Sequence, residues 1–125
     1  METEKVKNFD DLINIAAVSK TITVAGHDIK LKSLGYDEQS GMMDVIPDNI
    51  KESKKYDMLQ KEILANAIVS IDGVVLTHEN KVDLLSRAQT GFVNLMFAEY
   101  ELLIGDQNKI LEDVKKNILL VKKTP

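Results

Sequence analysis

The sequence contains no cysteine and no tryptophan, and it has only two prolines and two histidines among its 125 residues. Without cysteine there is neither a disulfide scaffold nor a thiolate metal site. The histidines, His27 and His78, lie in polar segments, and neither has a second metal ligand at the i, i+4 spacing of a helical site. We therefore predict that the protein binds no metal and no cofactor.

A basic surplus is also missing, because 20 Asp and Glu residues outnumber 16 Lys and Arg residues and give a formal net charge of -4. Proteins that bind the phosphate backbone usually carry an excess of Lys and Arg, so nucleic-acid binding is disfavoured. No apolar run approaches the roughly 20 residues that a membrane-spanning helix needs. The polar start METEKVKNFDD also lacks the apolar core of a secretory signal. These absences predict a soluble, cytoplasmic protein with no membrane partner.

No set of residues in the chain resembles a catalytic site. The six glycines are dispersed, so there is no glycine-rich phosphate loop, and Ser70 lacks the glycine-flanked elbow of a serine nucleophile. The carboxylate pairs at 10–11 and 37–38 stand where helices are expected to begin, and helix capping and the helix dipole explain them there. We therefore predict no catalytic residues and no enzymatic activity.

Residues 20–33 alternate between apolar and polar side chains and predict a β-hairpin. If Gly26-His27 forms a two-residue type II′ loop, Val24 lies opposite Ile29 and Ile22 lies opposite Leu31, with all four side chains on one face. A lone two-stranded hairpin is only marginally stable in water. Its apolar face must therefore pack against helices or against a partner.

Helical spacing of apolar residues dominates the rest of the chain and predicts helices at 8–18, 37–46, 56–70, 77–105 and 106–121. Thr77 is suited to cap the fourth helix, and Gly105 to end it. Thr90-Gly91 weakens its middle, so that it either kinks there or divides into two helices. The predicted fold is α+β and mostly α: a single domain, 1–125, with an N-terminal hairpin followed by a small helical bundle at 37–121. Residues 1–7 and 122–125 are expected to be polar tails.

The stretch ANAIVSIDGVVLT, residues 65–77, has two interpretations. Asp72-Gly73 between apolar residues is a signal for a tight β-hairpin. The preceding apolar residues instead follow helical spacing, at Leu59, Ile63, Ala67 and Ile71. Because no breaker residue stops a helix before Val69, we favour a helix that continues to about Ser70, with Gly73 beyond its end and a short extended piece after it.

The segment FVNLMFAEYELL is apolar over more than one helical face, whereas an amphipathic helix normally spares one side. It is either the central helix of the bundle or a helix that offers one side to a partner. Scattered methionines leave room for an adaptable binding surface. The candidate partner-binding residues are Phe92, Leu95, Met96, Phe97 and Tyr100.

In combination, four segments resemble the small tail assembly chaperones and baseplate-hub assembly proteins of tailed bacteriophages. These segments are TITVAGHDIKLKSL, the acidic helix start YDEQ, the helix ending in AIVSIDG, and LLSRAQTGFVNLMFAEYELL. The resemblance covers residues 20 to about 108 and is most specific in AIVSIDG with the helix before it. It implies a non-enzymatic protein that binds a tape-measure or hub protein of the growing tail and keeps its apolar helices from aggregating. It also implies a location in the host cytoplasm, since several such proteins are absent from the finished virion.

Three hypotheses about function follow. The first is a phage assembly factor that binds apolar helices of a tail, baseplate-hub or tape-measure protein in a groove, a role compatible with self-association of the chain. The second is a permanent structural component of the baseplate or virion tail. The third is a regulatory domain that binds nucleic acid, which the net charge of -4 disfavours.

Overall fold

The computed structural model describes the backbone of residues 10–123 and the side chains of residues 11–118. The fold is α+β and mostly helical, with the predicted hairpin near the N-terminus and helices after it. The elements in chain order are α2 (Asp10–Ile13), β1 (Ser19–Val24), β2 (His27–Lys32), α3 (Tyr36–Asp44), α4 (Glu52–Ala67), β3 (Ile68–Ile71), α5 (His78–Arg87) and α6 (Thr90–Lys123).

The hairpin of β1 and β2 turns at Ala25-Gly26, and the predicted loop at Gly26-His27 is wrong. Ala25 and Gly26 both have positive φ, 50° and 83°. Positive φ at both central positions is the requirement of a type I′ turn, whose twist matches that of the strands it joins. The left-handed conformation therefore begins one residue earlier than the glycine suggested.

This turn also changes the predicted pairing of the two strands. Ile22 lies opposite Ile29 and Val24 lies opposite His27, instead of the predicted pairs of Val24 with Ile29 and of Ile22 with Leu31. The difference amounts to two residues, and side chains in a strand alternate with a period of two. The apolar side chains consequently remain on the predicted face, where they pack against the core.

A third strand, β3, follows α4 directly, and the predicted continuation of the helix to about Ser70 is wrong. The backbone N–H of Ile68 still bonds to Leu64 in the helical manner. From there the chain pairs antiparallel with β2, with Ile71 opposite Ile29. The β-branched residues of IVSI suit a strand, and pairing satisfies the free backbone edge of β2, which outweighs the helical spacing of the apolar side chains.

The Asp72-Gly73 pair then forms the tight turn that the other interpretation of this stretch predicted. Both residues have positive φ, 53° and 79°. Ile71 and Val74 exchange two backbone hydrogen bonds across the turn, of 3.0 and 2.9 Å. Regular pairing goes no further, because Val74 forms only an isolated bridge with Ile71.

The two turns are bonded to each other at one end of the sheet. The Asp72 carboxylate contacts His27 Nδ1 at 2.6 Å through one oxygen and accepts from the Asp28 backbone N–H at 2.7 Å through the other. The backbone N–H of Asp72 donates in return to the Asp28 carbonyl at 2.7 Å. Asp72 therefore holds the turn after β3 against the start of β2.

The helix boundaries differ from the predictions in several places. α2 has only four residues instead of the predicted helix at 8–18, whose predicted start lies outside the described residues. α4 begins at Glu52, four residues before the predicted start at Tyr56. Thr77 caps α5 as predicted, since its hydroxyl accepts a hydrogen bond from the Asn80 backbone N–H at 3.1 Å.

The region around Thr90-Gly91 contains two helices, α5 and α6, which was one of the two predicted alternatives. The predicted end of a helix at Gly105 and the predicted separate helix at 106–121 are wrong, because α6 continues as one helix of 34 residues. An exposed glycine inside a helix costs only about 1 kcal/mol relative to alanine. The helix-forming residues on both sides of Gly105 outweigh that cost.

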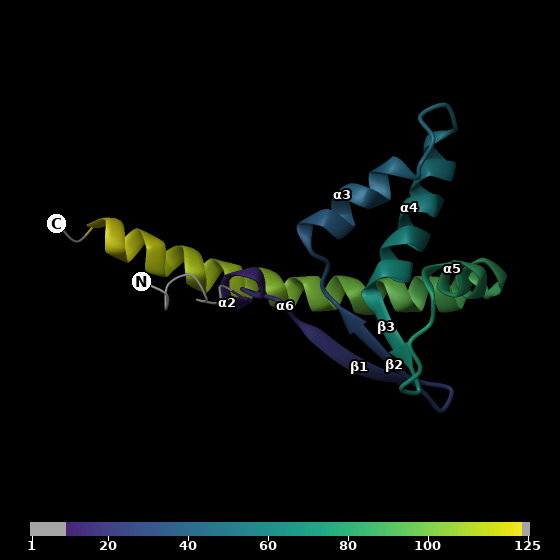
Figure 1. The fold of residues 1–125 in the computed structure, drawn as a ribbon, viewed down its shortest axis with the longest axis horizontal. Helices are drawn as coiled ribbons and strands as arrows, with labels where there is room; N and C mark the ends of the chain where they lie inside the picture. Colours follow the sequence, from purple (N-terminus) through teal and green to yellow (C-terminus); the bar gives the residue numbers. More distant parts are fainter. Residues whose placement is uncertain (1–9, 124–125) are drawn as a thin grey trace, which may run out of the picture.

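The core lies where the sheet and α4 meet the N-terminal half of α6. In Figure 1 the C-terminal half of α6 extends past these elements, beyond the short α2. The largest fully buried side chains are Leu31 of β2, Leu64 of α4, Ile68 of β3 and Met96 of α6. Residues from four different elements therefore close one apolar cluster.

A neighbouring pair of leucines on α6 tests this assignment of the core. Leu103 is 2% exposed, whereas Leu102 is 62% exposed. We expect Leu103→Ala to lower the free energy of unfolding by about 2–5 kcal/mol, as buried Leu→Ala changes do. Leu102→Ala should change it by less than about 0.5 kcal/mol. Urea denaturation measures both, and equal effects would contradict the described packing of α6.

The contact between the turns predicts a titration that NMR can follow. The hydrogen bond and the charge of Asp72 raise the pKa of His27 above its usual 6.5. The interaction is therefore fully present below pH 6.5 and is lost as the pH rises through the raised value. In Asp72→Asn, which keeps a residue suited to the turn, the pKa of His27 should fall back toward 6.5. A His27 titration curve that is the same in both proteins would exclude the contact.

Candidate partner-binding site

The five predicted contact residues on α6 do not form one surface. Met96 and Tyr100 are buried in the core, and Phe92 and Phe97 are half-buried against it. Leu95 is exposed, but helical spacing places it on a different face from Phe97 and Tyr100. Met96 therefore packs within the chain, which is the central-helix alternative for this part of α6.

Two of these residues line a groove between α3 and α6. Phe97, Tyr100 and Ile104 follow one another at i, i+3 and i+7, so they share a face of α6, and Gln39 of α3 lies across from them. The groove has a volume of about 520 Å³. The rings of Phe97 and Tyr100 lie 6.1 Å apart with their planes tilted by 37°, a separation typical of favourable aromatic pairs. The floor of the groove therefore has an aromatic centre, and Glu101, Gln107 and Asn108 of α6 add polar side chains to the lining.

Gln39 forms the wall of the groove on α3, and the same face of α3 exposes apolar side chains that the sequence analysis did not select. Tyr36 and Met43 are 85% and 62% exposed, and Met42 between them in sequence is buried. Tyr36, Gln39 and Met43 are spaced at i, i+3 and i+7, so the two exposed residues share the face of Gln39. The sequence signal was this spacing in YDEQSGMM, but only a folded chain shows which face of α3 the core covers.

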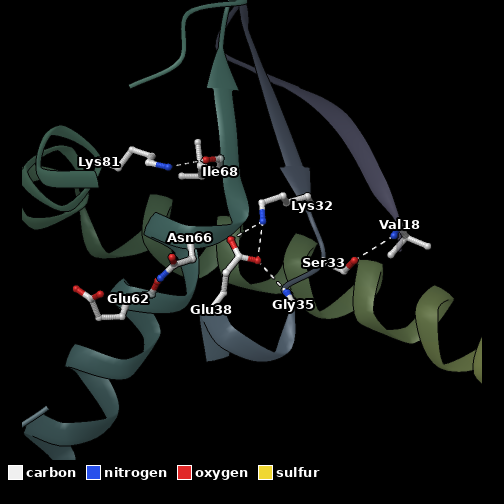
Figure 2. Close-up of polar contacts among 9 residues, drawn as sticks. All are labelled: Val18, Lys32, Ser33, Gly35, Glu38, Glu62, Asn66, Ile68 and Lys81. Atoms are coloured by element: carbon white, nitrogen blue, oxygen red, sulfur yellow. Dashed lines mark hydrogen bonds and ion pairs between the residues drawn. The ribbon is translucent and has the colours of Figure 1, made fainter. Parts of the chain in front are cut away.

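An ion pair at the N-terminus of α3 positions this wall (Figure 2). The Glu38 carboxylate accepts from Lys32 Nζ at 2.7 and 2.6 Å and from the Gly35 backbone N–H at 2.8 Å. The bond to Gly35 is the return contact of a capping box, which satisfies a free donor at the helix start. Lys32 ends β2, so this contact fastens α3 to the central strand of the sheet.

The connection before α3 is also fixed to β1. Ser33, a buried polar residue, accepts a hydrogen bond from the Val18 backbone N–H at 3.0 Å through its hydroxyl (Figure 2). The backbone N–H of Ser33 donates to the Val18 carbonyl at 2.8 Å. The segment between β2 and α3 is therefore held on two sides before the groove begins.

Burial and neighbouring charges shift the pKa values of Glu38, Tyr100 and Lys81. Burial acts to raise the pKa of Glu38, but the hydrogen bond from Gly35 and the hydrogen bond and charge of Lys32 outweigh it, so the pKa is lowered. Burial raises the pKa of Tyr100, and the negative charge of Glu38 raises it further, which keeps the phenol neutral. Burial lowers the pKa of Lys81, whose ammonium group donates to the Ile68 carbonyl at 3.0 Å.

Neither a metal centre nor a membrane-spanning helix is found in the part of the chain that the structure describes. Among the described side chains, those of residues 11–118, no three from His, Cys, Asp and Glu are placed to hold a metal ion. Within residues 10–123, no helix combines the length and the apolar character needed to cross a bilayer. Comparison of the chain with family models, with curated proteins and with solved structures finds no match. Function must therefore be inferred from the residues and their geometry.

The attachment of α3 predicts a pH-dependent stability. Glu38→Gln keeps the shape of the side chain but removes its charge, and we expect it to lower the free energy of unfolding at neutral pH by about 1 kcal/mol. This is below the usual range for hydrogen bonds to a charged group because the carboxylate is 35% exposed.

The pH profile gives the control for this substitution. A lowered pKa means that Glu38 stabilises the fold above its usual value of 4.5 and that this contribution is lost as the pH falls through the lowered value. The difference between the wild type and Glu38→Gln, measured by urea denaturation, should therefore shrink as the pH falls from about 7 to about 3. A difference that stays constant over this range would contradict the ion pair.

Proposed function

We propose that this protein is a non-enzymatic assembly factor of tailed bacteriophages. It binds an apolar helical segment of a tail, baseplate-hub or tape-measure protein and shields that segment until the segment is incorporated. The observation that carries this proposal is the groove between α3 and α6, which Phe97, Tyr100 and Ile104 line beside Gln39, together with the exposed Tyr36 and Met43 on the same face of α3 as Gln39.

The dimensions of the groove suit a helix as the bound element. Phe97 and Ile104 are seven residues apart, which is about 10 Å along the axis of α6 at 1.5 Å per residue. An amphipathic helix presents apolar side chains at i, i+3, i+4 and i+7 over the same distance. Tyr36 and Met43 mark the same separation along α3, so both sides of the groove match two turns of a bound helix.

The chemistry of the wall suits a factor that must accept different segments. Methionine is unbranched and adaptable, and exposed methionines are frequent in grooves that bind several helical sequences. Tyr36 adds a large contact area, and its hydroxyl can stay hydrogen-bonded to water. A segment bound here is covered on its apolar side while its polar side stays in solvent.

The sequence resemblance to tail assembly chaperones and baseplate-hub assembly proteins supplies the class of partner. Those proteins act on components that expose long apolar helices before assembly, and this groove offers such helices a place to bind. On this proposal the protein acts in the host cytoplasm and needs no cofactor. A permanent place in the baseplate or tail would use the same groove and differs only in whether the protein stays in the virion.

A substitution in the wall tests the proposal. The protein is co-expressed with its cognate tape-measure protein and, separately, with its cognate hub protein, and the soluble fraction and co-purification of each partner are measured. We expect Met43→Glu to reduce the recovered complex roughly tenfold, since a charge placed against an apolar helix costs about 1.4 kcal/mol or more. The matched control is Val75→Glu, which charges an exposed residue outside the groove and should leave recovery unchanged.

Two outcomes would contradict the proposal. The first is that neither partner gains solubility or co-purifies with the wild-type protein. The second is that Met43→Glu and Val75→Glu behave alike. Mass spectrometry of purified virions separates the two roles of the groove, because a permanent component is found there in stoichiometric amounts and an assembly factor is not.

A further inference from the structure

The C-terminal half of α6 carries an apolar stripe that the described chain leaves largely uncovered. In Figure 1 this half of the helix extends away from the sheet and from α4. Leu111 and Ile118 are 43% and 51% exposed, Ile110 is exposed as well, and Val114 is half-buried. Helix residues without tertiary contacts are usually polar on all sides, so an apolar stripe here needs a partner.

The spacing of this stripe identifies the kind of partner. Alternating steps of four and three residues from Val93 lead to Phe97, Tyr100, Ile104, Gln107, Leu111, Val114 and Ile118. All of these residues except Gln107 are apolar. A repeat of 3.5 residues is the seam along which two α-helices pack side by side. The first four positions pack against the chain's own core. The seam thus continues from an interface formed within the chain into a segment where the described residues form no such interface.

Gln107 marks the point at which the covered part of the seam ends. Its amide donates to the Ala16 carbonyl at 3.1 Å, so the segment after α2 closes over the seam at this residue. The positions beyond it are Leu111, Val114 and Ile118. We infer that Leu111 and Val114 pack against Val114 and Leu111 of a second copy of this chain, with Ile118 at the edge of the contact, in an antiparallel helix pair related by a two-fold axis.

The position of the folded body selects the antiparallel direction. This folded body consists of the sheet, α4 and α5, which pack against the seam of α6 as far as Ile104. In a parallel pair, the bodies of both copies would have to occupy the space between the two helices at the same end. In an antiparallel pair the two bodies lie at opposite ends of the contact, and only about the last turn of each helix comes level with the body of the other copy.

The charges beside the seam are self-complementary in this direction. An antiparallel helix pair brings the same flank of both seams together, and Glu112 and Lys115 lie three residues apart on one flank. When Leu111 of one copy faces Val114 of the other, Glu112 of each copy is about 3 Å along the axis from Lys115 of the other. The two-fold axis therefore produces two identical ion pairs around the central Leu111–Val114 contacts.

The dimer is weak, because the contact is short. Each copy contributes about two heptads, well below the roughly 800 Å² per partner of a standard stable interface. We expect a dissociation constant in the micromolar range, so that monomer and dimer exchange with concentration.

Sedimentation velocity of the full-length protein over a range of concentrations tests this inference. The wild type should shift from monomer to dimer with increasing concentration, and Leu111→Glu should remain monomeric at every concentration. Leu102→Glu is the matched control, since it charges an exposed leucine on the opposite side of α6 and should dimerise like the wild type. A wild type that stays monomeric, or a Leu111→Glu variant that still dimerises, would overturn the inference.

A charge exchange tests the register and the direction together. Lys115→Glu alone and Glu112→Lys alone place like charges across the pair, and each should weaken the dimer several-fold. The double variant Glu112→Lys/Lys115→Glu restores the opposite charges and should recover the wild-type constant. If the double variant loses as much dimerisation free energy as the two single variants together, the antiparallel register is excluded.

Because the natural chain has no cysteine, direction can also be measured by cross-linking. Leu111→Cys and Val114→Cys proteins, mixed and oxidised, should give a disulfide-linked heterodimer in preference to either homodimer. Preferential linkage of like with like would show a parallel pair. None of the substituted residues lines the groove between α3 and α6, so these measurements can fail or succeed independently of the proposed function.

Discussion

The backbone of β2 has donors and acceptors along both edges, and the rest of the structure depends on pairing them. β1 covers one edge through the Ala25-Gly26 turn, which is local and follows at once along the chain. The other edge is covered by β3, which comes from the end of α4. Ending α4 at Ala67 gives up further helical hydrogen bonds, but strand pairing replaces them and leaves no open edge on the central strand. The position of α4 over the core follows from this pairing, because α4 leads directly into β3.

The same strand determines where the groove lies. Leu31 of β2 is buried in the core against α6, and the next residue, Lys32, holds Glu38 at the beginning of α3. The end of β2 is therefore connected to both sides of the groove. Apolar packing connects it to α6, which forms the floor, and an ion pair connects it to α3, which forms the wall. An apolar contact is tolerant of direction, whereas an ion pair combined with a capping bond to Gly35 defines where the helix starts. This combination gives an exposed and short helix such as α3 a defined position beside α6.

Some features of the fold could be predicted from the sequence and others could not, for identifiable reasons. The apolar face of the hairpin was predicted because a strand repeats every two residues, but two loops that differ by one residue give the same face, so the register was not. The end of α4 was missed because Ile71 continues the helical spacing of Ala67 while also pairing with Ile29. Of the candidate site, Phe97 and Tyr100 were selected for their apolar character, whereas Tyr36 and Met43 were not, since only packing shows which face of α3 is free.

The length of α6 connects the two proposals. The helix continues through Gly105, so its covered half forms the floor of the groove and its uncovered half carries the proposed dimer contact. In an antiparallel pair centred between Leu111 and Val114, the two grooves lie roughly 36 Å apart along the helix axis, at 1.5 Å per residue. A partner that offers two apolar helices at this separation would bind both copies, and the second contact would form at a high effective concentration. Weak dimerisation then serves release as well as capture, because a partner that withdraws one helix into the growing assembly leaves the other held by a single groove.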